Sequence, residues 1–250
     1  MNKNNLKFNH NNTIVNFSNS ILKHFNCETH HDSIKEVDNV LKGHRKVAVL
    51  LFDGLGKHII RKHLKDNDYM RKHYLHTMDA TFPPTTVAST NGLLSGLYPI
   101  ENGWLSWTTY VKEYEKIIQP FTNIDHYSDN LILPKQYSIF NKICGYCSIF
   151  EQIKLKNPHI NVFDYKTKPI HVDGHENLKD AVKIIDDALN SGPDVFLYFY
   201  HVSPDHELHR LGVNSSKVNK KIKQINKFVQ AVTKKHPDTL FLTIADHGMV

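Results

Sequence analysis

The sequence has few cysteines and no long apolar segment. Only three of its 250 residues are cysteine, and it contains no run of about 18 apolar residues, the length that crosses a bilayer. Its N-terminus has no long apolar core followed by a small-residue cleavage site, and no internal repeat or low-complexity linker is present. These absences argue against a membrane-spanning protein and predict a cytoplasmic protein with no membrane partner.

Two of the cysteines, Cys144 and Cys147, form a single C-x-x-C pair. A structural zinc site needs a second pair of ligands, and the sequence has none. The pair lies in the apolar run ICGYCSIF, which favours buried cysteines and makes Tyr146–Phe150 a strand candidate. A redox role for the pair stays open.

The charge balance indicates an anionic partner without naming it. The net charge is +6 and eighteen histidines are present, but basic charge serves nucleic acid, membrane surfaces and phosphorylated metabolites alike. The most lysine-rich segment, Ser215–His236, has helical apolar spacing, so its lysines are most simply a solvated face. A nucleic-acid stripe is the minority interpretation.

Three continuously apolar runs predict strands buried on both faces of a parallel sheet: Lys46–Phe52, Asp194–Tyr200 and Thr239–Ala245. Segments with helical spacing lie between them or before them, over residues 14–22, 57–65, 177–190 and 215–236. With 40% hydrophobic residues the chain can bury a sizeable core. We therefore predict one α/β domain over residues 1–250, with a mostly parallel central sheet and helices on both faces.

Acidic and imidazole residues follow each of these strands: Asp53, then Asp205 with His209, then Asp246 with His247. In open α/β sheets ligands bind beyond the carboxyl ends of the strands, so these side chains are expected to converge. Crowded carboxylates repel one another unless cations neutralise them, and Asp with His suits zinc and related divalent ions. Any single aspartate after a strand is more often a turn residue or a helix cap.

A hydroxyl-rich turn lies in the stretch Thr81–Pro99, TFPPTTVASTNGLLSGLYP. Its two prolines force an extended approach, and the residues from Thr86 onward predict a short helix that Gly96 ends. Thr86 is thereby expected near the helix N-terminus, where free N–H groups and the helix dipole favour a phosphoryl group. The alternative is an ordinary capped helix.

An aromatic segment over Gly103–Phe121 alternates imperfectly and predicts a hairpin. Such a hairpin can form a lid over a site, or it can pack on its own aromatic side chains at the surface. The sequence leaves both alternatives open.

Four separated motifs resemble the alkaline phosphatase superfamily, in particular its branch of type I phosphodiesterases and nucleotide pyrophosphatases: VLLFDGLG, FPPTTVAST with SGLYP, SPDHELHRLG, and ADHGM. The match runs from about Val47 to the last residue. The resemblance implies an alkaline phosphatase-like fold and metal-dependent hydrolysis of phosphodiester or pyrophosphate bonds. It also implies two divalent metal ions, zinc or alternatively manganese.

The resemblance assigns roles to particular residues. Thr86 matches the family's threonine nucleophile, with Thr85 as the nearby competitor. Asp53, Asp246 and His247 match the ligands of the metal that activates it.

The second metal matches Asp205 and His209 in this resemblance. Ser89 stands where relatives have an asparagine that contacts phosphate, and Val87 replaces an aromatic residue that helps to hold a nucleobase. The family's further histidine ligand lies downstream of the D-H-G motif, whereas this sequence ends at Val250. No residue can be given that role, so the fold is expected to lack its C-terminal part.

The implied mechanism is a two-step displacement through a phosphothreonine, acting on a small phosphorylated substrate such as a nucleotide. Within the same chemistry the alternatives are a phosphomonoesterase or a phosphomutase-like relative. A truncated, inactive fragment that binds phosphate or metal is a further alternative. Nucleic acid is not the predicted partner, and the oligomeric state is not predicted.

Overall fold

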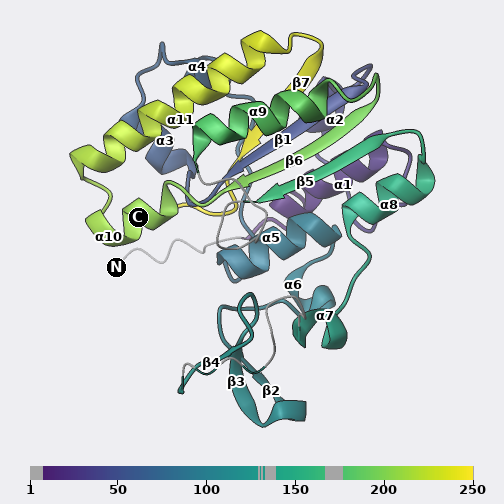
Figure 1. The fold of residues 1–250 in the computed structure, drawn as a ribbon, viewed down its shortest axis with the longest axis vertical. Helices are drawn as coiled ribbons and strands as arrows, with labels where there is room; N and C mark the ends of the chain where they lie inside the picture. Colours follow the sequence, from purple (N-terminus) through teal and green to yellow (C-terminus); the bar gives the residue numbers. More distant parts are fainter. Residues whose placement is uncertain (1–7, 129, 131, 133–138, 167–176, 250) are drawn as a thin grey trace.

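The computed structural model of the chain describes residues 8–128, 130, 132, 139–166 and 177–249. Val250, the last residue of the sequence, lies outside them. A four-stranded parallel sheet runs through the main body with helices on both faces, which confirms the predicted fold class (Figure 1). No helix in the described part of the chain combines the length and apolar character needed to span a bilayer.

The sheet consists of β1 (Lys46–Phe52), β5 (Asn161–Lys166), β6 (Val195–His201) and β7 (Thr239–Ile244) in the order β5-β6-β1-β7. Phe52 pairs with His201, and Leu51 pairs with Ile244, so three strands end at the same edge. The loops that carry the predicted metal ligands therefore start side by side.

Successive residues of β1 face opposite helical layers. Ala48, Leu50 and Phe52 pack with the layer formed by α3 (Lys57–His63), α4 (Tyr69–Lys72), α9 (Leu178–Leu189) and α11 (Ser216–Lys235). The residues between them pack with the layer formed by α1 (Ile14–His24), α2 (Lys35–Leu41) and α8 (Ile149–Lys156). All but Lys46 of β1 is buried, as the continuous apolar run predicts.

A second, smaller sheet lies below the first in Figure 1. It contains β2 (Thr109–Val111), β3 (Lys116–Gln119) and β4 (Ile124–Asp125), and a 3₁₀ turn over Lys112–Tyr114 joins the first two strands. The antiparallel pair β2–β3 falls within the predicted hairpin segment. Two short helices, α6 (Pro99–Asn102) and α7 (Ile139–Ile143), flank this sheet, and Trp104, Phe140 and Val87 belong to its small core.

The predicted strand at Tyr146–Phe150 is wrong. Ser148 caps α8 there, accepting a hydrogen bond from the Glu151 backbone in a capping box, and this local cap overrides the short apolar run. The strand of this region is β5, which lies at the edge of the sheet and has every residue partly exposed. Cys144 and Cys147 are correspondingly half-buried and exposed.

The covering helix α1 contacts α5 (Thr86–Ser95) through polar side chains as well as apolar ones. The fully buried Asn19 donates to the carbonyl of Gly96, which ends α5, at 2.9 Å. Its side-chain oxygen accepts from the backbone N–H groups of His30 and His31 at 2.8 and 3.1 Å. Asn19 therefore joins three segments that are distant in the sequence.

Replacing this side chain is expected to destabilise the fold. Asn19→Ala leaves one buried carbonyl and two N–H groups without a partner, which costs on the order of 2–4 kcal/mol of unfolding free energy. Urea denaturation measures the loss. The control Asn39→Ala removes an exposed asparagine of α2 and should change stability by less than about 0.5 kcal/mol. Equal effects of the two substitutions would contradict this role for Asn19.

Candidate functional site

The loops after three strands are held together by backbone hydrogen bonds around Asp53. The Asp53 N–H donates to the carbonyl of His201 at 3.0 Å, and the Asp53 carbonyl accepts from the N–H of Asp205 at 3.0 Å. The N–H of Gly54 donates to Oδ1 of Asp246 at 3.1 Å. These bonds place carboxylates from β1, β6 and β7 at one edge of the sheet.

Two glycines of the D-G-L-G turn permit this close approach. Gly54 has φ +68°, and a Cβ there would lie 2.9 Å from Cβ of Asp205. A Cβ at Gly56 would lie 2.5 Å from Cα of Gly248, in the loop after β7. Both distances are shorter than non-bonded contacts allow, so a side chain at either position would push the loops apart.

Thr86 is the first residue of α5 and lies against this edge. The Thr85 side chain caps the helix by accepting from the N–H of Ala88 at 3.3 Å. The Thr86 hydroxyl, in a residue only 3% exposed, lies 3.1 Å from Nε2 of His247 and 3.5 Å from Oδ1 of Asp53. The structure thus brings the predicted nucleophile to the predicted metal ligands.

The electrostatics of the cluster show that its carboxylates are crowded. Burial raises the pKa of Asp246 well above its usual range, and the neighbouring charge of Asp53 raises it further. Burial and the charge of Asp53 likewise raise the pKa of Asp205. Burial lowers the pKa of His247, but its hydrogen bond to Asp53 and the charges of Asp246 and Asp53 outweigh burial and raise that pKa to about 9.

The donor set fits a divalent cation. Asp53, Asp205 and His247 each offer a ligand atom, and these atoms lie within 4.8 Å of one another. Oδ1 of Asp205 and Oδ2 of Asp246 are buried without a hydrogen-bond partner among the described residues. Buried, unpartnered carboxylate oxygens beside an imidazole are the ligands that zinc and manganese accept.

Two of the predicted site residues, His209 and Ser89, are placed differently from the cluster of Asp53, Asp205, Asp246 and His247. His209, on α10 (Asp205–Leu211), has Nε2 3.4 Å from Oδ2 of Asp205, but its side chain is 69% exposed and belongs to the rim of the cluster. Ser89 is fully buried, and its hydroxyl is hydrogen-bonded to that of Thr81 at 3.0 Å. The Ser89 hydroxyl thus has a protein partner in Thr81, and its phosphate contact stays a prediction.

Sequence reasoning missed Tyr200. This residue, 3% exposed on β6, donates its hydroxyl to Oδ2 of Asp53, the oxygen that Thr86 does not contact. Burial and the charge of Asp53 raise the pKa of Tyr200, so the hydroxyl stays protonated and donates. The signal in the sequence is weak, because a tyrosine in DVFLYFY fits a buried strand equally well.

A cavity of about 260 Å³ opens beside Thr86. Its lining includes Tyr198 and Tyr200 from β6, Trp104 and Phe121 from the aromatic segment Gly103–Phe121, and Tyr146 from the loop before α8. The aromatic segment thus contributes two walls of a cavity at the candidate nucleophile.

A model of the family described as type I phosphodiesterase / nucleotide pyrophosphatase matches residues 47–250. The chain belongs to this family. Its membership explains why the four motifs meet at one edge of the sheet, and it confirms the predicted branch of the alkaline phosphatase superfamily. Comparison with curated proteins gives no match.

Solved structures similar to this phosphodiesterase-family chain include murine ectonucleotide pyrophosphatase / phosphodiesterase 5, with a TM-score of 0.60 and 15% sequence identity over 81% of this chain. An inactive threonine-to-alanine variant of that protein in complex with AMP gives a TM-score of 0.59 and 15% identity over 82% of this chain. In both cases this chain covers 57% of the neighbour's length. At this identity the likeness shows the fold alone.

The site predicts that a divalent cation stabilises the folded chain. Adding Mn²⁺ or Zn²⁺ to chelator-treated protein, at 100 times the dissociation constant, is expected to add about 2.7 kcal/mol and to raise the melting temperature by roughly 5–10 °C. Asp205→Asn should lose most of this gain. Without metal it should be no less stable than the parent, because one carboxylate leaves a crowded cluster.

Thermal melts with and without metal measure both effects. The matched control is Asp66→Asn, which changes an aspartate whose side chain is 92% exposed and which should respond to metal as the parent does. An undiminished metal response in Asp205→Asn would place the cation elsewhere, and an equal loss in both variants would show that the effect is not specific to Asp205.

Proposed function

We propose that this chain hydrolyses phosphodiester or pyrophosphate bonds, with Thr86 as the nucleophile. The observation that carries the proposal is the position of the Thr86 hydroxyl at the start of α5, 3.1 Å from Nε2 of His247 and 3.5 Å from Oδ1 of Asp53. The membership of the phosphodiesterase family supports the reaction class. The inactivity of the threonine-to-alanine variant of the murine neighbour supports a threonine nucleophile.

In the proposed mechanism, Oγ1 of Thr86 attacks phosphorus and gives up its proton to water, while the bond to the leaving oxygen breaks, that oxygen takes up a proton, and a phosphothreonine forms. Water then attacks the same phosphorus and loses a proton, while the bond to Oγ1 breaks and Oγ1 takes up a proton, which restores the threonine hydroxyl. The free N–H groups at the start of α5 would offset the negative charge of a phosphoryl group bound at Thr86. The Tyr200 hydroxyl holds one oxygen of Asp53, which leaves the other facing Thr86.

Two divalent metal ions, zinc or manganese, would complete this site. Asp53, Asp246 and His247 would hold the first ion, and Asp205 and His209 the second. When bound, such ions lower the pKa of the threonine hydroxyl and stabilise the charge on the phosphoryl oxygens. The unpartnered oxygens of Asp205 and Asp246 support this assignment.

The proposed substrate is a small phosphorylated compound, with nucleotides among the candidates. The complex of the murine neighbour with AMP supports a nucleotide. The aromatic cavity beside Thr86 supports a planar group next to the phosphate, because tyrosine, tryptophan and phenylalanine rings offer flat apolar walls.

Thr86→Ala is expected to lower hydrolysis of bis-p-nitrophenyl phosphate by at least about 10³-fold while leaving the fold intact, because it removes the hydroxyl that lies against His247 and Asp53. Release of p-nitrophenol with Mn²⁺ or Zn²⁺ present measures the rate, and circular dichroism checks the fold. Activity near that of the parent would remove Thr86 from the mechanism.

Thr85→Ala is the matched control. It removes the helix cap, which costs about 1 kcal/mol of stability, but it keeps the proposed nucleophile and should retain most of the turnover. The monoester p-nitrophenyl phosphate is assayed in parallel. Faster hydrolysis of the monoester than of the diester would assign the chain to the monoesterase alternative.

A further inference from the structure

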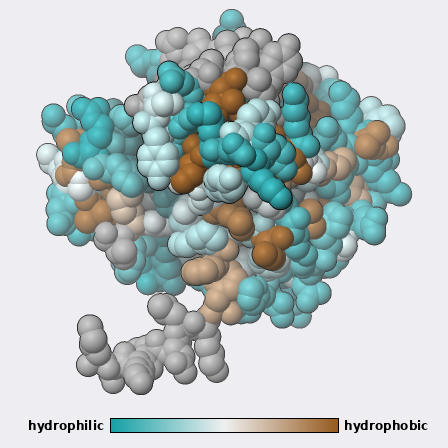
Figure 2. Space-filling model, turned by 90° about the horizontal axis from the view of Figure 1, so that it is seen from below, coloured by the Kyte–Doolittle hydropathy of each residue, from teal (hydrophilic) through white to brown (hydrophobic). Residues whose placement is uncertain are grey.

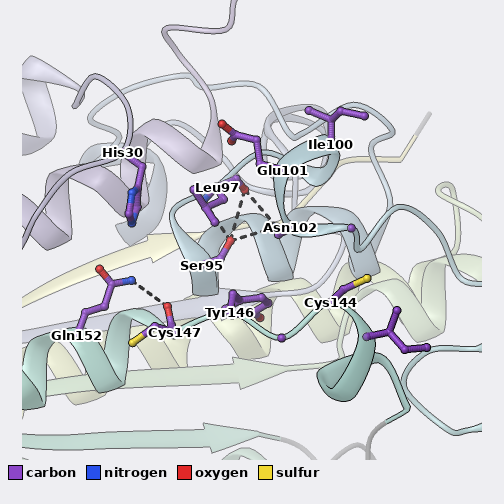
Figure 3. A pocket seen from close by; sticks show the side chains of 13 residues that line it. His30, Ser95, Leu97, Ile100, Glu101, Asn102, Cys144, Tyr146, Cys147 and Gln152 are labelled. Atoms are coloured by element: carbon purple, nitrogen blue, oxygen red, sulfur yellow. Dashed lines mark hydrogen bonds between the residues drawn. The ribbon is translucent and has the colours of Figure 1, made fainter.

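A second cavity lies close to the one beside Thr86. It has a volume of about 590 Å³ and is lined by residues at the ends of α5 and α6 and by the segment from Ile143 to Cys147 (Figure 3). Its rim includes Ile100, which is 85% exposed, so this outer cavity is open to solvent. The face that carries α6 and the small sheet mixes hydrophilic surface with apolar side chains (Figure 2).

Tyr146 is the one described residue that lines both cavities. Figure 3 shows it between Cys144 and Cys147. It is therefore the described residue at which the outer cavity and the inner cavity beside Thr86 meet.

Several contacts hold the Tyr146 ring in this position. Its hydroxyl donates to Oδ1 of Asn91, on α5, at 2.6 Å. The indole N–H of Trp104 donates to the carbonyl of Cys144 at 3.1 Å and fixes the segment just before it. A Cβ at Gly145 would lie 2.4 Å from the carbonyl oxygen of Asn141, so a side chain at this position would displace the segment that carries Tyr146.

The volumes of the two cavities indicate how much space a substrate has on either side of Tyr146. Ligand sites in proteins typically measure roughly 300–1,000 Å³. The inner cavity, at about 260 Å³, falls below that range, whereas the inner and outer cavities joined would lie well within it. The ring of one side chain therefore decides whether a long group attached to the phosphate has space.

We infer that Tyr146 is the residue that limits substrate size, so that the site accepts phosphate esters with a small group and excludes those with long chains. This inference rests on the proposed function, because it takes the inner cavity as the substrate site. It adds a determinant of substrate size that lies in the loop before α8, apart from the candidate metal ligands and the candidate nucleophile. The outer cavity is the space that a long chain would occupy if the ring were absent.

The test compares the binding of methylphosphonate and octylphosphonate, which cannot be hydrolysed, in the presence of Mn²⁺. Calorimetry gives the ratio of their dissociation constants. Octylphosphonate is expected to bind the parent no better than methylphosphonate. Tyr146→Ala should improve the binding of octylphosphonate relative to methylphosphonate by at least about tenfold, because several methylene groups become buried.

Two variants control this result. Tyr146→Phe keeps the ring and should keep the parent's ratio, although it loses the hydrogen bond to Asn91. Tyr127→Ala makes the same truncation at a tyrosine that is 80% exposed and should also keep that ratio. An unchanged ratio in Tyr146→Ala, or a shift of equal size in Tyr127→Ala or Tyr146→Phe, would overturn the inference.

Hydrolysis of bis-p-nitrophenyl phosphate by the parent is measured on the same preparation. Absence of hydrolysis counts against the proposed function, whereas the phosphonate ratio still decides whether Tyr146 limits size. The two failures are therefore distinguishable.

Discussion

The arrangement of the site depends on Asp53. Its backbone bonds to His201 on one side and to Asp205 on the other, and these bonds tie the loop after β1 to the loop after β6. One of its carboxylate oxygens accepts from Tyr200, and the other faces Thr86 and His247. A single residue thereby sets the distance between the helix start that carries the hydroxyl and the strand ends that carry the other acidic groups. Parallel strands in register make this convergence available, because their carboxyl ends meet at one edge.

This convergence has a cost in stability that the surrounding fold offsets. Asp246 is completely buried beside Asp53, and Asp205 is also close to Asp53, so the folded chain crowds carboxyl groups that water would otherwise separate. The compensation comes from the two apolar layers that cover β1 and from the polar attachment of α1 to α5. The site tolerates crowded carboxylates because rigid elements hold each of them, and a cation is the counter-charge that such a cluster accepts.

The sequence predicts the parts of the fold that rest on local patterns. The strand β1 begins and ends where its apolar run does, and α5 begins at Thr86 and ends before Gly96, as the proline and glycine positions indicate. The edge strand β5 escapes such reasoning because none of its residues is buried and its pattern resembles a loop. Ser89 shows a different limit. The family resemblance implies a phosphate contact for it, and only the tertiary structure reveals that its hydroxyl is hydrogen-bonded to that of Thr81.

The roles of Tyr200 and Tyr146 cannot be predicted from a local sequence pattern. Both are tyrosines in apolar surroundings, where burial of the ring is the ordinary expectation, and their hydroxyls gain a role only through partners far along the chain, Asp53 and Asn91. The two differ in where they lie. Tyr200 belongs to the central sheet and acts on the residues that carry the chemistry, whereas Tyr146 belongs to the irregular chain beside the small antiparallel sheet. The residues of the proposed reaction and the proposed determinant of substrate size therefore lie in different parts of the fold. A substitution at Tyr146 can change the shape of the cavity without replacing a residue at the strand ends of the parallel sheet.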